Sequence, residues 1–228
     1  MVDHLKLFMG TRFSRKAGAS QHTDSSENKF CTLYTAMVNM LLTGNIPMEV
    51  VKFFRVNLLM ALPKSDSDVR PIGIGCLLRK VASKLLFRRI LANRTYLAHF
   101  QPWQYALLPL GMETIIHGLN VMRTTNPTYD TFLMDADNAF NSSFRPIAMD
   151  EILELCPEAA PFVMLMYGEN SKQVLYRDGK IECVTSVTGF HQGDVLGPWG
   201  YTMNIQPLLK RLAESLEDDF PGQVAGKI

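Results

Sequence analysis

The sequence of 228 residues lacks the features that mark several common classes of protein. No apolar run approaches the roughly 18 to 20 residues that cross a bilayer, so a membrane-spanning protein is not expected. The first residues contain no long apolar stretch followed by a small-residue cleavage site, which argues against secretion. We therefore expect an intracellular protein, located in the cytoplasm, the nucleus or both.

Cysteine is also scarce, and its arrangement excludes two kinds of site. The four cysteines are scattered singly, without CxxC pairs or neighbouring histidines: Cys31, Cys76, Cys156 and Cys183. Zinc sites and disulfide frameworks need clustered or paired cysteines, so we expect buried, reduced thiols. A dinucleotide site is excluded as well, because Leu78 breaks the GxGxxG pattern that begins at Gly73.

Apolar side chains are plentiful, since 47% of the residues are hydrophobic, and a buried core is expected. The net charge of +1 hides an uneven distribution. Residues 1–94 carry 15 basic and 6 acidic side chains, a net +9, whereas residues 95–228 carry 8 basic and 16 acidic ones, a net −8. A phosphate-binding region beside a metal-binding region would produce this asymmetry, and so would ordinary solvated charge.

Hydrophobic periodicity predicts a mixture of helices and strands, and hence an α+β fold. Residues 18–28 are small and polar and are expected to form a flexible connector. The expected helices are 30–42, 77–94, 112–122, 146–155, 159–167 and 197 to about 216, and the expected strands are 56–62, the run from 70, 132–135 and a hairpin over 173–185.

Residues 131–141, with the sequence TFLMDADNAFN, place Asp135 and Asp137 at the end of an expected strand. Carboxylates there are costly to bury unless a cation, a partner or solvent meets them. A calcium loop would alternate oxygen ligands in the same way, but Phe140 occupies the position that needs glycine and Pro146 the position that needs glutamate. The stretch therefore indicates metal chemistry of another kind.

Two groups of basic residues accompany these carboxylates. Lys64 and Arg70 flank the loop between two expected strands, where they can reach a triphosphate or simply be solvated. Lys80, Lys84 and Arg88 recur at i, i+4 and i+8 on the helix expected at 77–94, so they share one face. A polyanion would relieve their mutual repulsion, whereas a solvated helix face is the simpler interpretation.

Four motifs, taken in order and spacing, resemble those of the reverse transcriptases of non-LTR (LINE-type) retrotransposons. They are LeuProLys at 62–64 with ArgProIle at 70–72, the segment 104–117, residues 135–141 and the glycine-rich loop 189–198. The resemblance covers nearly everything from Lys29 onward. It implies a right-hand polymerase fold of the α+β class, with a leader and linker at 1–28, a fingers-like region at 29–125, and a partial palm with an antiparallel sheet at 126–228.

The resemblance also implies roles for individual residues. Asp135 becomes the catalytic aspartate that binds Mg²⁺, or Mn²⁺ in its place, for two-metal nucleotidyl transfer. Phe140 falls where the family places an aromatic gate against the ribose 2′-hydroxyl, with core packing as the alternative. Asp194 belongs to the same loop motif but is not assigned a metal. The implied partners are an RNA template, a DNA primer and a deoxynucleoside triphosphate, and the implied nucleotide contacts are Lys64, Arg70, Ala136, Asp137, Phe140, Gln192 and Gly193.

One motif of the family is absent. Its aromatic-x-Asp-Asp hairpin supplies the remaining metal ligands, but the pair Asp218-Asp219 follows an acidic helical pattern with no hairpin strands around it. Residues 224–228 resemble the strand that enters that hairpin. We therefore expect a chain truncated before this motif, completed by a C-terminal palm and thumb segment of the same polyprotein, with little or no polymerase activity alone.

Two other functions fit the sequence. A non-catalytic, nucleic-acid-binding relic would use Lys80, Lys84, Arg88 and the fingers loop, and its binding would depend steeply on salt. A purely structural palm-like protein would bind neither metal nor nucleic acid.

Overall fold

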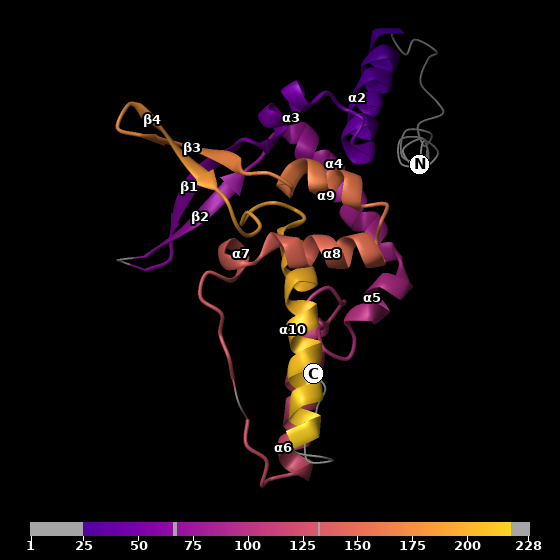
Figure 1. Cartoon of the computed structure of the whole chain (residues 1–228), viewed down its shortest axis with the longest axis vertical. Coiled ribbons are helices and arrows are strands. Elements are labelled where there is room, and N and C mark those ends of the chain that lie inside the picture. The colour runs from indigo at the N-terminus through magenta and orange to yellow at the C-terminus, as the bar shows by residue number, and fades with distance from the viewer. Residues whose placement is uncertain (1–24, 66–67, 132, 220–228) are drawn as a thin grey trace, which may run out of the picture.

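The structure, a computed structural model, describes residues 25–65, 68–131 and 133–219 (Figure 1). Two β-hairpins project from one side of a helical body, and the last helix extends away from it. None of the described helices is long and apolar enough to cross a membrane. The elements are α2 (Ser25–Thr43), α3 (Met48–Arg55), β1 (Asn57–Pro63), β2 (Val69–Ile74), α4 (Leu77–Ala92), α5 (Arg94–Phe100), α6 (Gly111–Thr125), α7 (Ala139–Ser142), α8 (Arg145–Leu155), α9 (Ala160–Tyr167), β3 (Ser171–Arg177), β4 (Lys180–Ser186) and α10 (Gly197–Asp219).

The hydrophobic core lies among the helices. Helix α9 is buried almost all round, because its sequence APFVMLMY carries apolar side chains on every face. It packs against α2, α3 and α8, while α8 also packs against α10. Among the described residues, the largest fully buried apolar side chains include Trp199, Phe162, Phe190 and Ile152. The core therefore joins the N-terminal helices to the segment that leads into α10.

The sheet has four strands in the order β2-β1-β3-β4. Both hairpins are antiparallel, but the central pair, β1 with β3, is parallel, with Asn57 opposite Gln173 and Leu58 opposite Val174. The α+β class is confirmed, and the fully antiparallel sheet is wrong at this pair. The helices α4 to α9 separate the two hairpins in sequence, and so long a connection can return a strand in the same direction. The right-hand polymerase type stays a prediction.

Most of the expected elements are present. The six expected helices correspond to α2, α4, α6, α8, α9 and α10, and the hairpin turns at Asp178-Gly179. Helix α2 begins at Ser25, so the connector expected at 18–28 is wrong for its last four residues, and the rest of it lies outside the described residues. Helices α3, α5 and α7 were not predicted. The three-part division also stays a prediction, and the sheet takes two strands from each side of residue 125.

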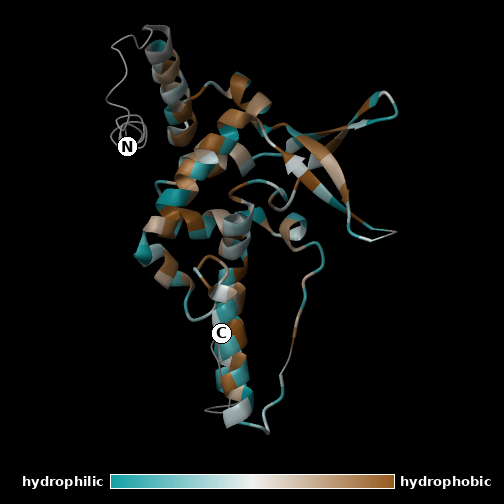
Figure 2. Ribbon diagram, turned by 180° about the vertical axis from the view of Figure 1, so that it is seen from behind, coloured by the Kyte–Doolittle hydropathy of each residue, from teal (hydrophilic) through white to brown (hydrophobic). Residues whose placement is uncertain are grey.

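The strand expected at 132–135 is wrong where the structure describes it. Residues 133–136 have no regular secondary structure, and Phe132 lies outside the described residues. Leu133 and Met134 are 82% and 70% exposed, and no described strand pairs with this segment. Figure 2 shows the apolar stretch in brown on the extended chain that leads to α7. An apolar run forms a strand only when a neighbouring strand satisfies its backbone groups.

The cysteine prediction is half right. All four thiols are free, but only Cys156 is buried, whereas Cys31 and Cys183 are exposed. Burial raises the pKa of the Cys156 thiol to about 11, so this cysteine is unreactive at neutral pH.

The core can be tested on two adjacent residues of α8. Ile152 is fully buried and its neighbour Leu153 is 49% exposed. We expect Ile152→Ala to lower the free energy of unfolding by about 2–5 kcal/mol, because the change removes buried methylene groups and leaves a cavity. Leu153→Ala is the matched control and should cost under about 1 kcal/mol. Urea denaturation followed by circular dichroism measures both, and equal losses would contradict the described core.

Candidate functional site

A cleft of about 870 Å³ lies where three segments distant in sequence meet: hairpin β1–β2, residues 135–140 and the loop 191–194. The sequence predicts eight residues for catalysis or nucleotide binding, and all eight line this cleft. They are Lys64, Arg70, Asp135, Ala136, Asp137, Phe140, Gln192 and Gly193. The structure thus brings these residues together, while their chemical roles stay predictions.

The basic wall of the cleft comes from the first hairpin. Arg70 lies on β2 opposite Leu62 of β1, and its side chain is exposed. Lys64 follows β1, and its ammonium lies 3.4 Å from an Asp68 carboxylate oxygen. Both of these side chains are more than half exposed, so the ion pair is weak and leaves Lys64 able to meet an anion.

The acidic wall is held less firmly. Asp135 and Asp137 are exposed on the irregular segment that precedes α7. Asn138 caps this short helix with a φ of +49°, a left-handed conformation that asparagine tolerates better than most residues. The Asn138 carbonyl accepts hydrogen bonds from the backbone N–H groups of Asn141 (2.9 Å) and Ser142 (3.0 Å). One helical turn therefore connects the two carboxylates to the rest of the fold.

Phe140 belongs to both the cleft and the packed interior. It is half-buried, lines the cleft, and packs against Tyr201 with ring centroids 5.3 Å apart. Its carbonyl accepts hydrogen bonds from the backbone N–H of Phe190 (2.7 Å) and the hydroxyl of Ser143 (3.1 Å). The gate and packing interpretations of Phe140 are therefore compatible.

The Gln192-Gly193 pair is attached to β2. The Gly73 N–H donates to the Gln192 carbonyl at 2.7 Å, and Gly193 has a φ of +93°. A Cβ on Gly193 would lie 2.8 Å from the Ile72 side chain and 3.0 Å from the Gly73 carbonyl oxygen. The resemblance implies that Gln192 and Gly193 contact the nucleotide, and the structure shows that the missing side chain of Gly193 makes room for β2.

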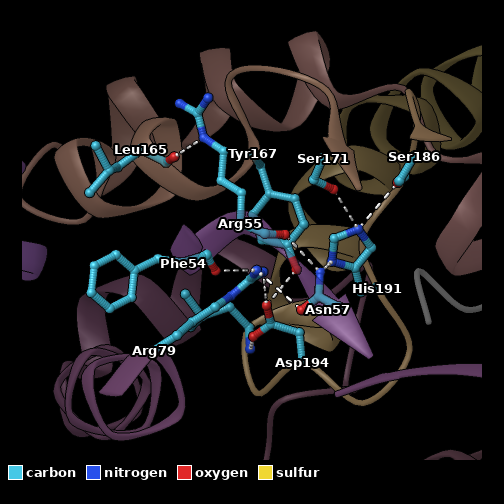
Figure 3. A network of polar contacts seen from close by, with 12 residues as sticks. Phe54, Arg55, Asn57, Arg79, Leu165, Tyr167, Ser171, Ser186, His191 and Asp194 are labelled. Carbon is cyan, nitrogen blue, oxygen red and sulfur yellow. Dashed lines mark hydrogen bonds and ion pairs between the residues drawn. The ribbon is translucent and has the colours of Figure 1, made fainter. Parts of the chain in front are cut away.

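Asp194 is committed to a buried network (Figure 3). Its carboxylate forms an ion pair with Arg79 of α4, and the two side chains are 6% and 2% exposed. It also accepts hydrogen bonds from the Tyr167 hydroxyl at 2.6 Å and the Leu196 N–H at 3.1 Å. Burial alone would raise the pKa of the Asp194 carboxyl, but Arg79 and these donors hold it below its usual value. With its oxygens so occupied, Asp194 is unsuited to binding a metal.

Asn57 extends this network to His191 (Figure 3). The Asn57 side-chain oxygen accepts from Arg79 at 3.3 Å, which turns the amide nitrogen toward the His191 Nδ1, 3.0 Å away. Since the amide nitrogen is a donor, Nδ1 must accept, and the proton of neutral His191 lies on Nε2. Nε2 lies 3.2 Å from the hydroxyls of Ser171 and Ser186, which can accept it.

The carboxylates of the cleft limit what it can hold. In the described ranges, no group of three or more His, Cys, Asp or Glu side chains is placed to hold a metal ion. Asp68 is paired with Lys64 and Asp194 with Arg79, which leaves Asp135 and Asp137. Two carboxylates suit one Mg²⁺ that completes its shell with phosphate oxygens and water. Among the described residues that line the cleft, no further unpaired carboxylate is present for a second ion.

The second basic group lies away from the cleft. Lys80, Lys84 and Arg88 are on α4, and none of them lines the cleft. Lys80 is half-buried, while Lys84 and Arg88 are exposed. Their proposed contacts with nucleic acid stay predictions.

Sequence reasoning missed the residues that hold the cleft together. Arg79 is one of five basic residues on its helix, and periodicity does not distinguish a buried arginine from solvated neighbours. The available signals were weak: Asn57 is a lone polar residue in an apolar strand, and His191 stands among glycines. Tyr167 reads as part of an apolar helix, and only its position relative to Asp194 reveals its partner.

Fold and cleft together define an α+β protein with an open polar cleft beside a small mixed sheet. No family model matches the sequence. The chain is 24% identical over 187 residues to the retrotransposable element SLACS 132 kDa protein of Trypanosoma brucei gambiense. The match covers 80% of this chain and 15% of that protein. This similarity indicates a distant relation to a retrotransposon protein, and the chain spans about 15% of that relative's length.

The buried ion pair can be tested by removing one of its charges. We expect Asp194→Asn to lower the free energy of unfolding by about 3–5 kcal/mol, because Arg79 would remain buried without a counter-charge. Asp137 lines the same cleft but is exposed, so Asp137→Asn is the matched control. It should change the free energy of unfolding by less than about 0.5 kcal/mol. Chemical denaturation measures the free energy of unfolding of both variants. A loss in Asp194→Asn as small as that expected for the control would show that the ion pair contributes little to stability.

The buried imidazole predicts a pH dependence of stability. Burial, followed by the positive charge of Arg79, lowers the pKa of His191 to about 4, and Asp194 only partly offsets this. The unfolded chain binds a proton below about pH 6.5 and the folded chain does not until about pH 4, so stability falls as the pH falls through this window. The total loss should be about 3 kcal/mol.

This dependence is measured as the difference between wild type and His191→Gln in urea denaturation at pH 7 and pH 5. The variant should lose less stability than wild type between these two values. NMR titration of the His191 ring checks the same point directly, and a midpoint near 6.5 would contradict the buried, neutral imidazole.

Proposed function

We propose that this chain is a reverse-transcriptase-type region that binds a deoxynucleoside triphosphate in the cleft, for transfer to a DNA primer on an RNA template. The observation that carries the proposal is the convergence of basic, acidic, aromatic and glycine residues from three segments on one cleft. The distant relation to a retrotransposon protein supports it. The resemblance of the motifs to LINE-type reverse transcriptases gives the order of the parts.

The basic wall is suited to the triphosphate. Arg70 presents a planar guanidinium that can bind two phosphate oxygens at once, and its place on a paired strand limits its freedom. Lys64 adds a second positive charge just beyond the end of β1, where its weak ion pair with Asp68 leaves it able to meet the phosphates. Both side chains belong to a hairpin that is attached to the Gln192-Gly193 loop through Gly73.

The acidic wall would lie on the opposite side of the same phosphates. Asp135 and Asp137 are the carboxylates of the cleft that no described ion pair occupies. Mg²⁺ bound there would neutralise charge between these carboxylates and the phosphates. Because a second ion would need further ligands, we propose that nucleotide binding exceeds primer extension in this chain alone. Binding is therefore the more informative measurement.

The proposal predicts that the affinity for dGTP in the presence of Mg²⁺ depends on Arg70. Arg70→Ala should weaken binding by about ten- to a hundredfold, the usual effect of losing hydrogen bonds from a charged donor. Isothermal titration calorimetry measures the dissociation constant. Arg177→Ala is the matched control, because Arg177 is also an exposed arginine on a strand of the sheet but lies at the far turn of the second hairpin.

Three outcomes separate the alternatives. Loss of dGTP affinity in Arg70→Ala but not in Arg177→Ala supports a nucleotide site in the cleft. Absence of dGTP binding, combined with RNA binding that weakens steeply with salt and depends on Lys84, would favour the nucleic-acid-binding relic. Absence of both would leave the purely structural interpretation.

A further inference from the structure

Tyr201 lies in the first turns of α10 and supports Phe140 from behind. The two ring centroids are 5.3 Å apart and the ring planes are inclined by 35°. Phe140 lines the cleft, whereas Tyr201 is half-buried and does not line it. A group entering the cleft would therefore meet Phe140 first, and Tyr201 could act on it only through the phenylalanine ring.

The first turn of α10 completes this support. Gly197 and Tyr201 are four residues apart and so lie on the same face of the helix. A Cβ placed on Gly197 would lie 3.9 Å from the Phe140 ring, in ordinary van der Waals contact, so this face of the helix lies close to the ring. The backbone of Phe140 is fixed separately, through the N–H of Phe190. Backbone and ring are therefore held by different elements.

The position of Tyr201 also relates it to Asp135. Burial, together with the negative charge of Asp135, raises the pKa of the Tyr201 phenol, so its hydroxyl stays protonated at neutral pH.

We propose that Tyr201 is a positioning residue for sugar selection, which holds Phe140 against the sugar of the bound nucleotide and so excludes a ribose. This inference rests on the proposed function. An aromatic gate discriminates only if it resists displacement, because a ring that can swing away would admit the 2′-hydroxyl. The packed Tyr201 ring opposes that movement, since displacing Phe140 would break the contact between the rings.

The measurement is the ratio of the dissociation constants of GTP and dGTP, determined with Mg²⁺ by calorimetry. Wild type should bind dGTP more tightly, and Phe140→Ala should abolish the preference. Tyr201→Ala should lower the ratio by about two- to tenfold, the scale of an aromatic pair, with dGTP affinity changed less than about twofold. Tyr201→Phe keeps the ring and should retain the preference.

Tyr176→Ala is the matched control, because this tyrosine is 67% exposed on β3 away from the cleft, and it should leave the ratio unchanged. If Tyr201→Ala fails to fold, Tyr201→Leu replaces it, since leucine fills part of the space without supplying a ring. A wild-type ratio of the two dissociation constants in a folded Tyr201 variant would overturn the role of Tyr201. An equal loss of affinity for GTP and dGTP would do the same, and either result would leave the proposed function standing. Failure of wild type to bind dGTP would overturn the proposed function as well.

Discussion

The ion pair between Arg79 and Asp194 is the interaction on which the cleft depends. Burying either charge alone costs several kcal/mol, and such a pair is stable only when further hydrogen bonds satisfy its remaining donors and acceptors. Here the Tyr167 hydroxyl and the Leu196 N–H complete the shell of the carboxylate, and the Arg79 guanidinium lies 5.2 Å from the Tyr167 ring centroid. Helix α4 and the loop before α10 are therefore fixed relative to each other.

The consequences of this pair extend along β1. Because Arg79 also donates to Asn57, the first residue of β1 has a fixed amide orientation, and that orientation determines which nitrogen of His191 carries the proton. Protonating the second nitrogen would bring two donors together, next to the positive charges of Arg79 and Arg145. The network thus keeps His191 neutral. Its hydrogen bonds and ion pair join one strand, one helix and one loop.

Prediction from sequence succeeded where local periodicity determines structure. The amphipathic pattern of residues 30–42 and the turn residues Asp178-Gly179 define their elements without help from distant parts of the chain. The expected strand at 132–135 is wrong because an apolar run does not reveal whether a partner strand exists. The antiparallel sheet is wrong at β1–β3 for a similar reason, since neither strand encodes the direction of a neighbour more than a hundred residues away.

The candidate site shows the same division. Its lining residues could be predicted from short motifs, and the structure places them on one cleft. The residues that support the lining could not, because Arg79, Asn57 and Tyr167 belong to no motif and acquire their roles only through contacts across the fold. Tyr201 is a similar case, since helical periodicity gives no reason to pair it with Phe140.

The two walls of the cleft differ in how they are anchored, and the loop at 189–198 connects them. It reaches α4 through Asp194, and its Phe190 N–H reaches the Phe140 carbonyl. Gly189 permits that approach, because a Cβ there would lie 2.3 Å from the Phe140 carbonyl oxygen and its φ is +67°. The exposed segment with Asp135 has no comparable buried anchor among the described residues. The position of that carboxylate therefore depends on Phe140 and on the loop behind it, so a change at Asp194 can alter the acidic wall without touching it.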